Sequence, residues 1–205
     1  GMDALTHAVE AYTCRGATPY TDALAIEAIR LVGRSLRRAV ADGCDMQART
    51  DMCWAEYMAG LAFSNAGLGL GHSIAHQLGA QYHIPHGAAC AQILPRVMEY
   101  NIPACLERMG DIASALGADI RGLSAQEAAQ AAADCVRDLS EDIGIRPLHS
   151  YGFSMDDIPL LARHAMEDTC TPSNPVDAVE GEVARIIAKT YCEGLVVEAV
   201  RQQGF

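Results

Sequence analysis

A long stretch without charged side chains runs through the middle of this sequence. From Tyr57 to Pro95 there is no Asp, Glu, Lys or Arg. Its length alone would allow a membrane span, but it contains four histidines, three glutamines, Asn65 and many glycines. A bilayer core accepts such polar groups only at high cost. We therefore expect this segment to form the buried centre of a soluble domain, with its polar groups turned toward a site.

Apolar residues recur at helical spacing along most of the remaining chain. Ser124 and Glu127 have the spacing of a capping box, which predicts the start of one helix. No run of alternating β-branched residues predicts a strand. We therefore expect an all-α, multi-helix fold over residues 1–205 as a single domain. The expected helices cover residues 3–12, 21–41, 46–63, 71–82, 86–100, 105–116, 124–143, 154–167 and 180–202.

Three glycines, Gly67, Gly69 and Gly71, suggest a nucleotide-binding loop as an alternative. A dinucleotide loop follows a strand and has the spacing Gly-x-Gly-x-x-Gly. Neither feature is present here. Close packing between helices is the better explanation of these glycines.

Composition excludes some partners and favours one compartment. The chain has 26 acidic and 15 basic side chains and a formal net charge of −11, so a nucleic acid or an anionic membrane is a poor partner. Eight cysteines are scattered without a Cys-x-x-Cys pair, and the N-terminus has no basic start followed by an apolar stretch. We expect reduced, mostly buried cysteines in a cytoplasmic protein.

Two pairs of polar residues lie four positions apart, so each pair shares one face of a helix. Asp3 and His7 form the first pair, and His72 and His76 form the second within the charge-free segment. Buried histidines need partners. An Asp/His pair on a helix is commonly a surface pair or a cap, so Asp3 alone is weak evidence for a ligand.

The chain break at Pro85 adds two more histidines, His83 and His86. A carboxylate and several imidazoles from separate helices can surround one ion, and this donor set suits Fe(II) or Zn(II). The residues alone leave two possibilities open, a metal site and a set of core histidines satisfied by hydrogen bonds.

Several ordered motifs resemble the iron-containing (group III) alcohol dehydrogenases. They are GMDALTHAVE (1–10), AFSNAGLG (62–69), GHSIAHQLGAQYHIPHG (71–87), LPRVMEYN (94–101) and DTCTPSNP (168–175). The resemblance spans nearly the whole chain and implies the helical C-terminal half of that family, a dehydroquinate synthase-like fold. Val176 departs from the pattern, because many relatives have Arg there.

The resemblance also implies the roles of particular residues. The metal, Fe(2+) or alternatively Zn(2+), would be held by one carboxylate and three imidazoles. These ligands are Asp3, His7, His72 and His86. His76 would lie near the substrate and relay a proton, Phe63 and Cys170 would line the substrate and nicotinamide pocket, and His83 would lie at the pocket rim or behind the ligands.

In that family an N-terminal α/β domain holds NAD(P). No βαβ unit is recognisable here, so we expect that domain to be absent from this chain and the chain alone to be inactive. An apolar face left by the missing domain favours a homo-oligomer. The expected substrate is a small alcohol or aldehyde.

Three hypotheses remain for the function. The first is the metal-binding catalytic domain of an NAD(P)-dependent alcohol dehydrogenase. The second is a stand-alone helical metal-binding protein without redox activity. The third is a helical scaffold or interaction domain that binds no metal. Metal content separates the third from the first two, and an NAD(P)H-linked assay of a full-length form separates the first from the second.

Overall fold

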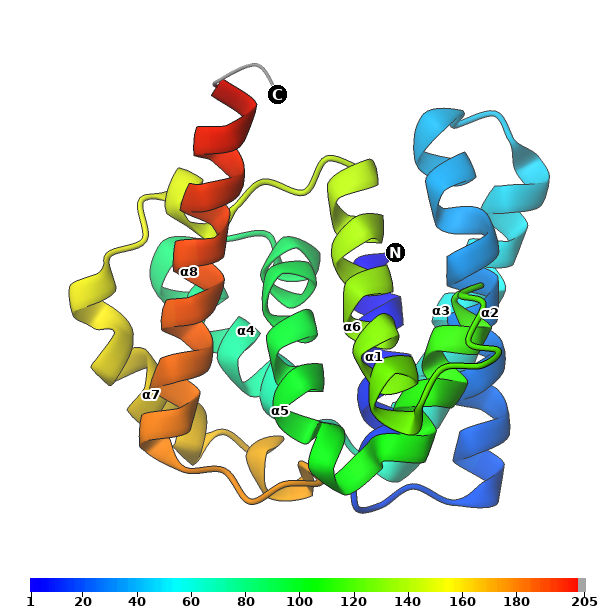
Figure 1. Cartoon of the computed structure of the whole chain (residues 1–205), viewed down its shortest axis with the longest axis horizontal. Helices are drawn as coiled ribbons and strands as arrows, with labels where there is room; N and C mark the ends of the chain where they lie inside the picture. The colour runs from blue at the N-terminus through cyan, green and yellow to red at the C-terminus, as the bar shows by residue number, and fades with distance from the viewer. Residues whose placement is uncertain (203–205) are drawn as a thin grey trace.

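The computed structural model describes the backbone of residues 1–202 and the side chains of residues 1–195, and this part of the chain is helical and has no strands (Figure 1). The predicted all-α fold is confirmed. Short 3-10 turns lie at Leu148–Tyr151 (η1), Met155–Asp157 (η2) and Thr171–Ser173 (η3). The α-helices are α1 (Met2–Thr13), α2 (Pro19–Ala41), α3 (Met46–Ala66), α4 (Leu70–Tyr82), α5 (His86–Ala115), α6 (Ala125–Asp142), α7 (Ile158–Glu167) and α8 (Glu180–Gln202).

The helix boundaries differ from the sequence predictions in three places. The helix predicted over 46–63 continues to Ala66, where Gly67 ends it with a φ of 103°. The two helices predicted over 86–100 and 105–116 are present and meet at a kink with non-helical backbone angles at Cys105, but helical structure also covers residues 101–104, so they form the continuous element α5. The helix predicted from Ser154 begins instead at Ile158 after a 3-10 turn, because Pro159 suits the first turn of a helix. The predicted capping box of Ser124 and Glu127 is present.

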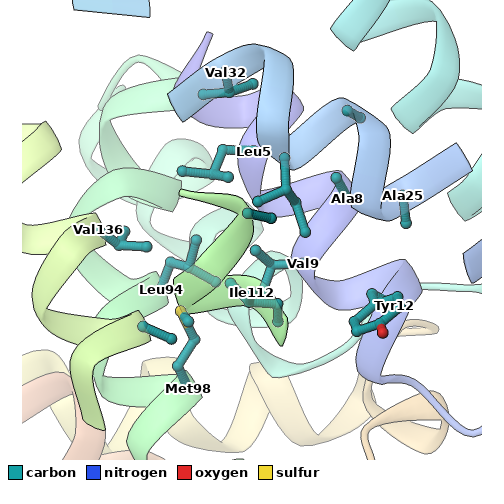
Figure 2. Close-up of a cluster of buried hydrophobic side chains, with 14 of the residues drawn as sticks. Leu5, Ala8, Val9, Tyr12, Ala25, Val32, Leu94, Met98, Ile112 and Val136 are labelled. Carbon is teal, nitrogen blue, oxygen red and sulfur yellow. The ribbon is translucent and has the colours of Figure 1, made fainter. Parts of the chain in front are cut away.

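Helix α5 lies between two hydrophobic cores. Leu94 and Met98 point into a core that also includes residues of α1, α2, α3 and α6 (Figure 2). Ile93 and Val97, on another face of the same helix, point into a core shared with α4, α7 and α8. Because one helix serves both cores, α5 holds the two groups of helices together, and it begins at His86.

The charge-free segment 57–95 covers the end of α3, all of α4 and the start of α5. Most of its apolar side chains are buried, as predicted for the centre of a domain. They include Ala59, Ala62, Leu70, Ile74, Leu78, Ile84, Ile93 and Leu94. No helix among the described residues combines the length and hydropathy that crossing a bilayer requires.

The prediction that most cysteines are buried was wrong. All eight are free, but only Cys14, Cys90 and Cys105 are buried. Cys44, Cys53 and Cys192 are exposed, and the others are intermediate. Helical periodicity assigned Cys53 and Cys192 to helices, but it could not tell which helix faces remain uncovered.

Candidate metal centre

Four side chains from three helices meet at one point. Helix α1 presents Asp3 and His7 one turn apart, α4 presents His72, and His86 is the first residue of α5. The Oδ1 atom of Asp3 lies 3.7 Å from His7 Nε2, 3.5 Å from His72 Nε2 and 3.3 Å from His86 Nε2. Asp3 therefore lies near all three histidines predicted as ligands. His72 and His86 belong with Asp3 to one group of donor atoms within 4.8 Å of one another, whereas His7 approaches Asp3 from outside that group.

These separations match those of ligands around one cation. Two N or O ligands at about 2.0–2.2 Å from a metal with tetrahedral angles lie about 3.3–3.6 Å apart. The three Asp3–histidine distances, from 3.3 to 3.7 Å, fall in or beside this range. The donor set, three imidazoles and a carboxylate, is one that divalent transition metals accept.

The environment of His72 gives an independent test of the fit. Its side chain is 1% exposed, and its Nε2 atom is buried without a hydrogen-bond partner. A buried polar atom without a partner is costly. Its Nδ1 atom, in contrast, lies 2.6 Å from Oε2 of the buried Glu10. Because Glu10 holds Nδ1, Nε2 is the ring nitrogen that faces Asp3 Oδ1, at 3.5 Å, and it can bind a cation once the cation displaces its proton.

Glu10 connects two helices as well as orienting His72. Its carboxylate accepts the backbone N–H groups of Gly69, Gly71 and His72 at the start of α4, at 3.1, 2.6 and 3.3 Å. The positive end of the helix dipole favours an anion there. A Cβ atom on Gly71 would lie 2.6 Å from Glu10 Oε1. The glycines therefore allow a close approach of the Glu10 side chain, a packing role of the kind predicted.

Sequence reasoning missed Glu10. The available signal was an acidic residue between the apolar Val9 and Ala11, seven positions after Asp3 and hence on the same face.

The ring of His7 is oriented by stacking. It lies between Phe63, with ring centroids 4.3 Å apart, and His72, with centroids 4.6 Å apart. Its Nδ1 atom is buried and makes no hydrogen bond. Phe63, predicted to line the pocket, therefore lies directly against one of the predicted ligands and forms an apolar wall beside it.

The charges of the cluster favour a bound cation. Burial alone would raise the pKa of Asp3, but the imidazole of His72 at 3.5 Å and the nearby His7 lower it to about 2. Burial and the neighbouring His72 lower the pKa of His7 to about 4. Burial opposes protonation of His72 as well, but the carboxylates of Asp3 and Glu10 outweigh it and raise its pKa to about 9. The two carboxylates thus attract one positive charge to this point.

Cys90 was not among the predicted site residues, yet its thiol reaches the cluster. Its Sγ atom lies 3.8 Å from Asp3 Oδ1 and 3.7 Å from His86 Nε2. Asp3, His72, His86 and Cys90 each offer one donor atom within 4.8 Å of the others. The sequence signal was the four-residue spacing from His86 to Cys90 on α5, which places both on one helix face.

His76 lies beside the cluster, one turn after His72 on α4. Its side chain is 42% exposed, and its ring stacks on that of His86 with centroids 5.6 Å apart. Its Nδ1 atom lies 2.9 Å from Oδ2 of Asp168, the residue after α7. Asp168 was quoted only as part of a motif, and its contact with His76 was missed because the two are distant in sequence.

The segment that carries Asp168 is anchored to α4 and α5. Thr171 Oγ1 lies 2.8 Å from Ser73 Oγ. The buried Asn174 accepts the backbone N–H of Leu70 at 3.2 Å and exchanges hydrogen bonds with Asn101 at 2.8 and 3.0 Å. These contacts fix residues 168–174 against the helix that bears His76.

Cys170 and His83, the other residues predicted to lie at the pocket, have different surroundings. Cys170 offers a donor atom within 4.8 Å of those of His76 and Asp168, so it lies beside the proposed proton-relay residue. His83 is exposed at the end of α4, with a φ of 52°. Among the described residues it belongs to neither group of clustered donor atoms.

Known proteins are similar to this chain over most of its length. The profile of the Fe-containing alcohol dehydrogenase family, C-terminal, matches residues 1–191. The chain is 48% identical to 1,3-propanediol dehydrogenase of Klebsiella pneumoniae over 192 residues, which is 93% of this chain and 50% of that protein. It is 46% identical to lactaldehyde reductase of Escherichia coli (strain K12) over 187 residues, 91% of this chain and 48% of that protein.

Solved structures show the same fold. A crystal structure of 1,3-propanediol oxidoreductase superposes with a TM-score of 0.91 at 48% identity, covering 92% of this chain and 50% of that one. An alcohol dehydrogenase from Oenococcus oeni gives a TM-score of 0.91 at 42% identity, covering 93% and 50%. The chain spans about half the length of the curated relatives that it matches. On this evidence the chain belongs to the Fe-containing alcohol dehydrogenase family and corresponds to its C-terminal part.

Proposed function

We propose that residues 1–205 form the metal-binding catalytic domain of an NAD(P)-dependent alcohol dehydrogenase. The reaction is oxidation of an alcohol to an aldehyde or ketone, or its reverse. The observation that carries this proposal is the convergence of Asp3 Oδ1 on three imidazoles around the buried, unpartnered Nε2 atom of His72. Similar proteins are named as 1,3-propanediol dehydrogenase, lactaldehyde reductase and NAD-dependent methanol dehydrogenase, which supports a small alcohol or aldehyde substrate.

The proposed ligands hold a single divalent cation. Fe(2+) is favoured by the family, and Zn(2+) fits the same donors. When bound, such a cation acts as a Lewis acid that stabilises the alkoxide form of the alcohol. The protein fixes the ligand geometry through the Glu10 hydrogen bond to His72 and the stacking of Phe63 on His7.

His76 is the proposed proton-handling residue. Its Nδ1 atom is occupied by the carboxylate of Asp168 at 2.9 Å, so the opposite nitrogen, Nε2, remains available to accept a proton. Because the ring stacks on His86 and is also partly exposed, it can take the hydroxyl proton of a substrate and release it to water. Phe63, Cys170 and His83 are proposed to line the substrate and nicotinamide pocket.

Nicotinamide binding is proposed to depend on an α/β domain outside these residues. We therefore expect no NAD(P)H-linked turnover from residues 1–205 alone, whereas a form that includes such a domain should oxidise small alcohols. A homo-oligomeric state and a cytoplasmic location remain predictions of the same proposal.

Metal content tests the proposal directly. We expect the purified chain to contain about one Fe or Zn per chain and His72→Ala or His86→Ala to lose most of it, because each variant removes one ligand. His164→Ala is the matched control, since His164 lies outside both groups of clustered donor atoms. Equal metal content in the wild type and both ligand variants would overturn the site. A metal-loaded chain joined to a nicotinamide domain but inactive on all alcohols would favour a metal-binding protein without redox activity.

A further inference from the structure

Cys90 differs from the other buried cysteines in what surrounds its sulfur. The thiol of Cys14 lies 3.2 Å from the carbonyl oxygen of Ala66, and that of Cys105 lies 3.7 Å from the carbonyl oxygen of Thr13. These are ordinary backbone partners for a buried thiol. The neighbours of Cys90 Sγ are instead Asp3 Oδ1 and His86 Nε2, at 3.8 and 3.7 Å.

The distances from Cys90 are close to those between ligands of one metal. A sulfur at about 2.3 Å and a nitrogen or oxygen at about 2.0–2.2 Å from a tetrahedral metal lie about 3.5–3.7 Å apart. Cys90 is fully buried, so the contact lies in the interior and not on a mobile surface. The unpartnered Nε2 atom of His72 belongs to the same group of donor atoms.

Rotation of the thiol away from the cluster is restricted by packing. Cys90 lies on α5 between Ala89 and Ala91, both buried, and belongs to the core formed with α4, α7 and α8. The four-residue spacing that puts Cys90 and His86 on one face is fixed by the helix. A cation reaching Asp3 and His86 would therefore meet the sulfur without any change of fold.

We propose that Cys90 is a metal ligand that completes a set of four donor atoms with Asp3, His72 and His86, in the position that the proposed function gives to His7. Its sulfur gives this site a preference for thiophilic cations such as Zn(II) over hard cations such as Mn(II). This inference rests on the metal site of the proposed function. A coordinate bond forms from Sγ to the cation, and the thiol proton passes to water; no atom is oxidised or reduced. Thiolate donors favour Zn over harder ions, whereas carboxylate and imidazole donors alone discriminate less between them.

Cobalt(II) is the probe for this ligand. A Co(II)–thiolate bond should give a sulfur-to-metal charge-transfer absorption in the near ultraviolet that N and O ligands do not give. We expect the Co(II)-loaded wild-type chain to show this band and Cys90→Ser to lose it while still binding Co(II). Cys105→Ser is the matched control, because Cys105 is also buried but lies outside both groups of clustered donor atoms; the band should be unchanged in that variant.

Two further measurements test Cys90 as a ligand, and the first needs no variant. X-ray absorption of the Zn(II)-loaded wild-type chain should contain a sulfur shell at about 2.3 Å. In competition titrations Cys90→Ser should lower the ratio of Zn(II) to Mn(II) affinity by about tenfold or more.

Two results would overturn the inference in distinguishable ways. Bound Co(II) or Zn(II) without the charge-transfer band or sulfur shell would remove Cys90 from the ligands and leave the metal site of the proposed function standing. Failure of the wild-type chain to bind Co(II), Zn(II) or Mn(II) would overturn both.

Discussion

Glu10 and His72 lie on different helices, and Glu10 Oε2 is 2.6 Å from His72 Nδ1. The same carboxylate accepts three backbone N–H groups at the start of α4. The contact therefore sets the tautomer of His72 and also fixes α4 relative to α1, the helix of Asp3 and His7. A carboxylate behind a metal-binding histidine raises its basicity and holds its ring in place.

Replacing Glu10 by Gln should weaken metal binding. Gln removes the negative charge, and its amide nitrogen cannot accept the hydrogen bonds that Glu10 now accepts from α4. Loss of such a supporting group typically costs about 10–100-fold in metal affinity. Competition of Zn(II) between the chain and a chelator measures this change.

A surface carboxylate provides the comparison for Glu10. Glu127 is exposed and only caps α6, so Glu127→Gln should bind Zn(II) like the wild type. Unchanged Zn(II) affinity in a folded Glu10→Gln chain would show that the carboxylate has no part in metal binding.

Asp168→Asn should reverse the tautomer of His76. Asn keeps one oxygen, which can still accept the Cys170 N–H that Asp168 Oδ1 accepts at 2.9 Å. In place of Oδ2 it presents an N–H donor to His76 Nδ1, so the ring proton should move to Nε2. Ring nitrogen-15 chemical shifts, recorded by NMR where the imidazole is neutral, report the tautomer.

The same substitution at Asp177 serves as the control for Asp168. The Asp177 side chain is 89% exposed and pairs with Arg15, so Asp177→Asn should leave the His76 resonances unchanged. Identical ring shifts in Asp168→Asn and wild type would exclude Asp168 as the group that orients His76.

Local sequence signals were sufficient for most of the fold. Helical periodicity and the Ser124–Glu127 capping box predicted the elements, because both depend on residues within one or two turns. They did not show that helical structure continues from residue 100 to the kink at Cys105, or that Cys53 lies on an exposed helix face, because its exposure depends on which helix faces find partners. Packing between distant segments decides such features.

For the candidate site too, the sequence showed residues that are close along one helix but not contacts between distant segments. Asp3–His7 and His72–His76 were visible as pairs because a helix turn brings them together. The carboxylates behind them were not, since Glu10 and His72 are 62 residues apart and Asp168 and His76 are 92 residues apart. The placement of His86 among the ligands came from family resemblance, and no spacing rule connects it with Asp3.

Glu99 should make the stability of the chain sensitive to acid. Burial alone would raise the pKa of Glu99, but hydrogen bonds from Arg137 and Arg96 outweigh it and lower the pKa below the ordinary 4.5. A carboxyl with a depressed folded-state pKa stabilises the fold above pH 4.5 and loses this contribution as the pH falls through the folded value. Glu99→Gln should therefore be less stable by about 1 kcal/mol at pH 7, with the difference shrinking toward pH 3.

Urea unfolding at several pH values measures this difference for Glu99. Glu56 is exposed, so Glu56→Gln should follow the wild type at every pH. A Glu99→Gln deficit that stays constant from pH 7 to pH 3 would assign the effect to packing of the side chain and not to its charge.

Leu94→Ala should separate the stability of the fold from the chemistry of the site. Leu94 is 0% exposed and lies in the core with Val9, Ile112 and Val136 (Figure 2). Truncating a buried leucine costs about 2–5 kcal/mol in unfolding free energy, because it removes apolar contacts and leaves a cavity. Leu123 is 43% exposed, so Leu123→Ala should change stability by less than about 0.5 kcal/mol.

Zn(II) affinity then decides how far the core and the site depend on one another. Leu94 and His86 share α5, but the ligands are oriented by Glu10 and Phe63, which lie on α1 and α3. We therefore expect folded Leu94→Ala to bind Zn(II) within about threefold of the wild type, far less than the loss expected for Glu10→Gln. A parallel loss of stability and Zn(II) affinity in Leu94→Ala would mean that core packing along α5, and not the groups behind the ligands, sets the geometry of the site.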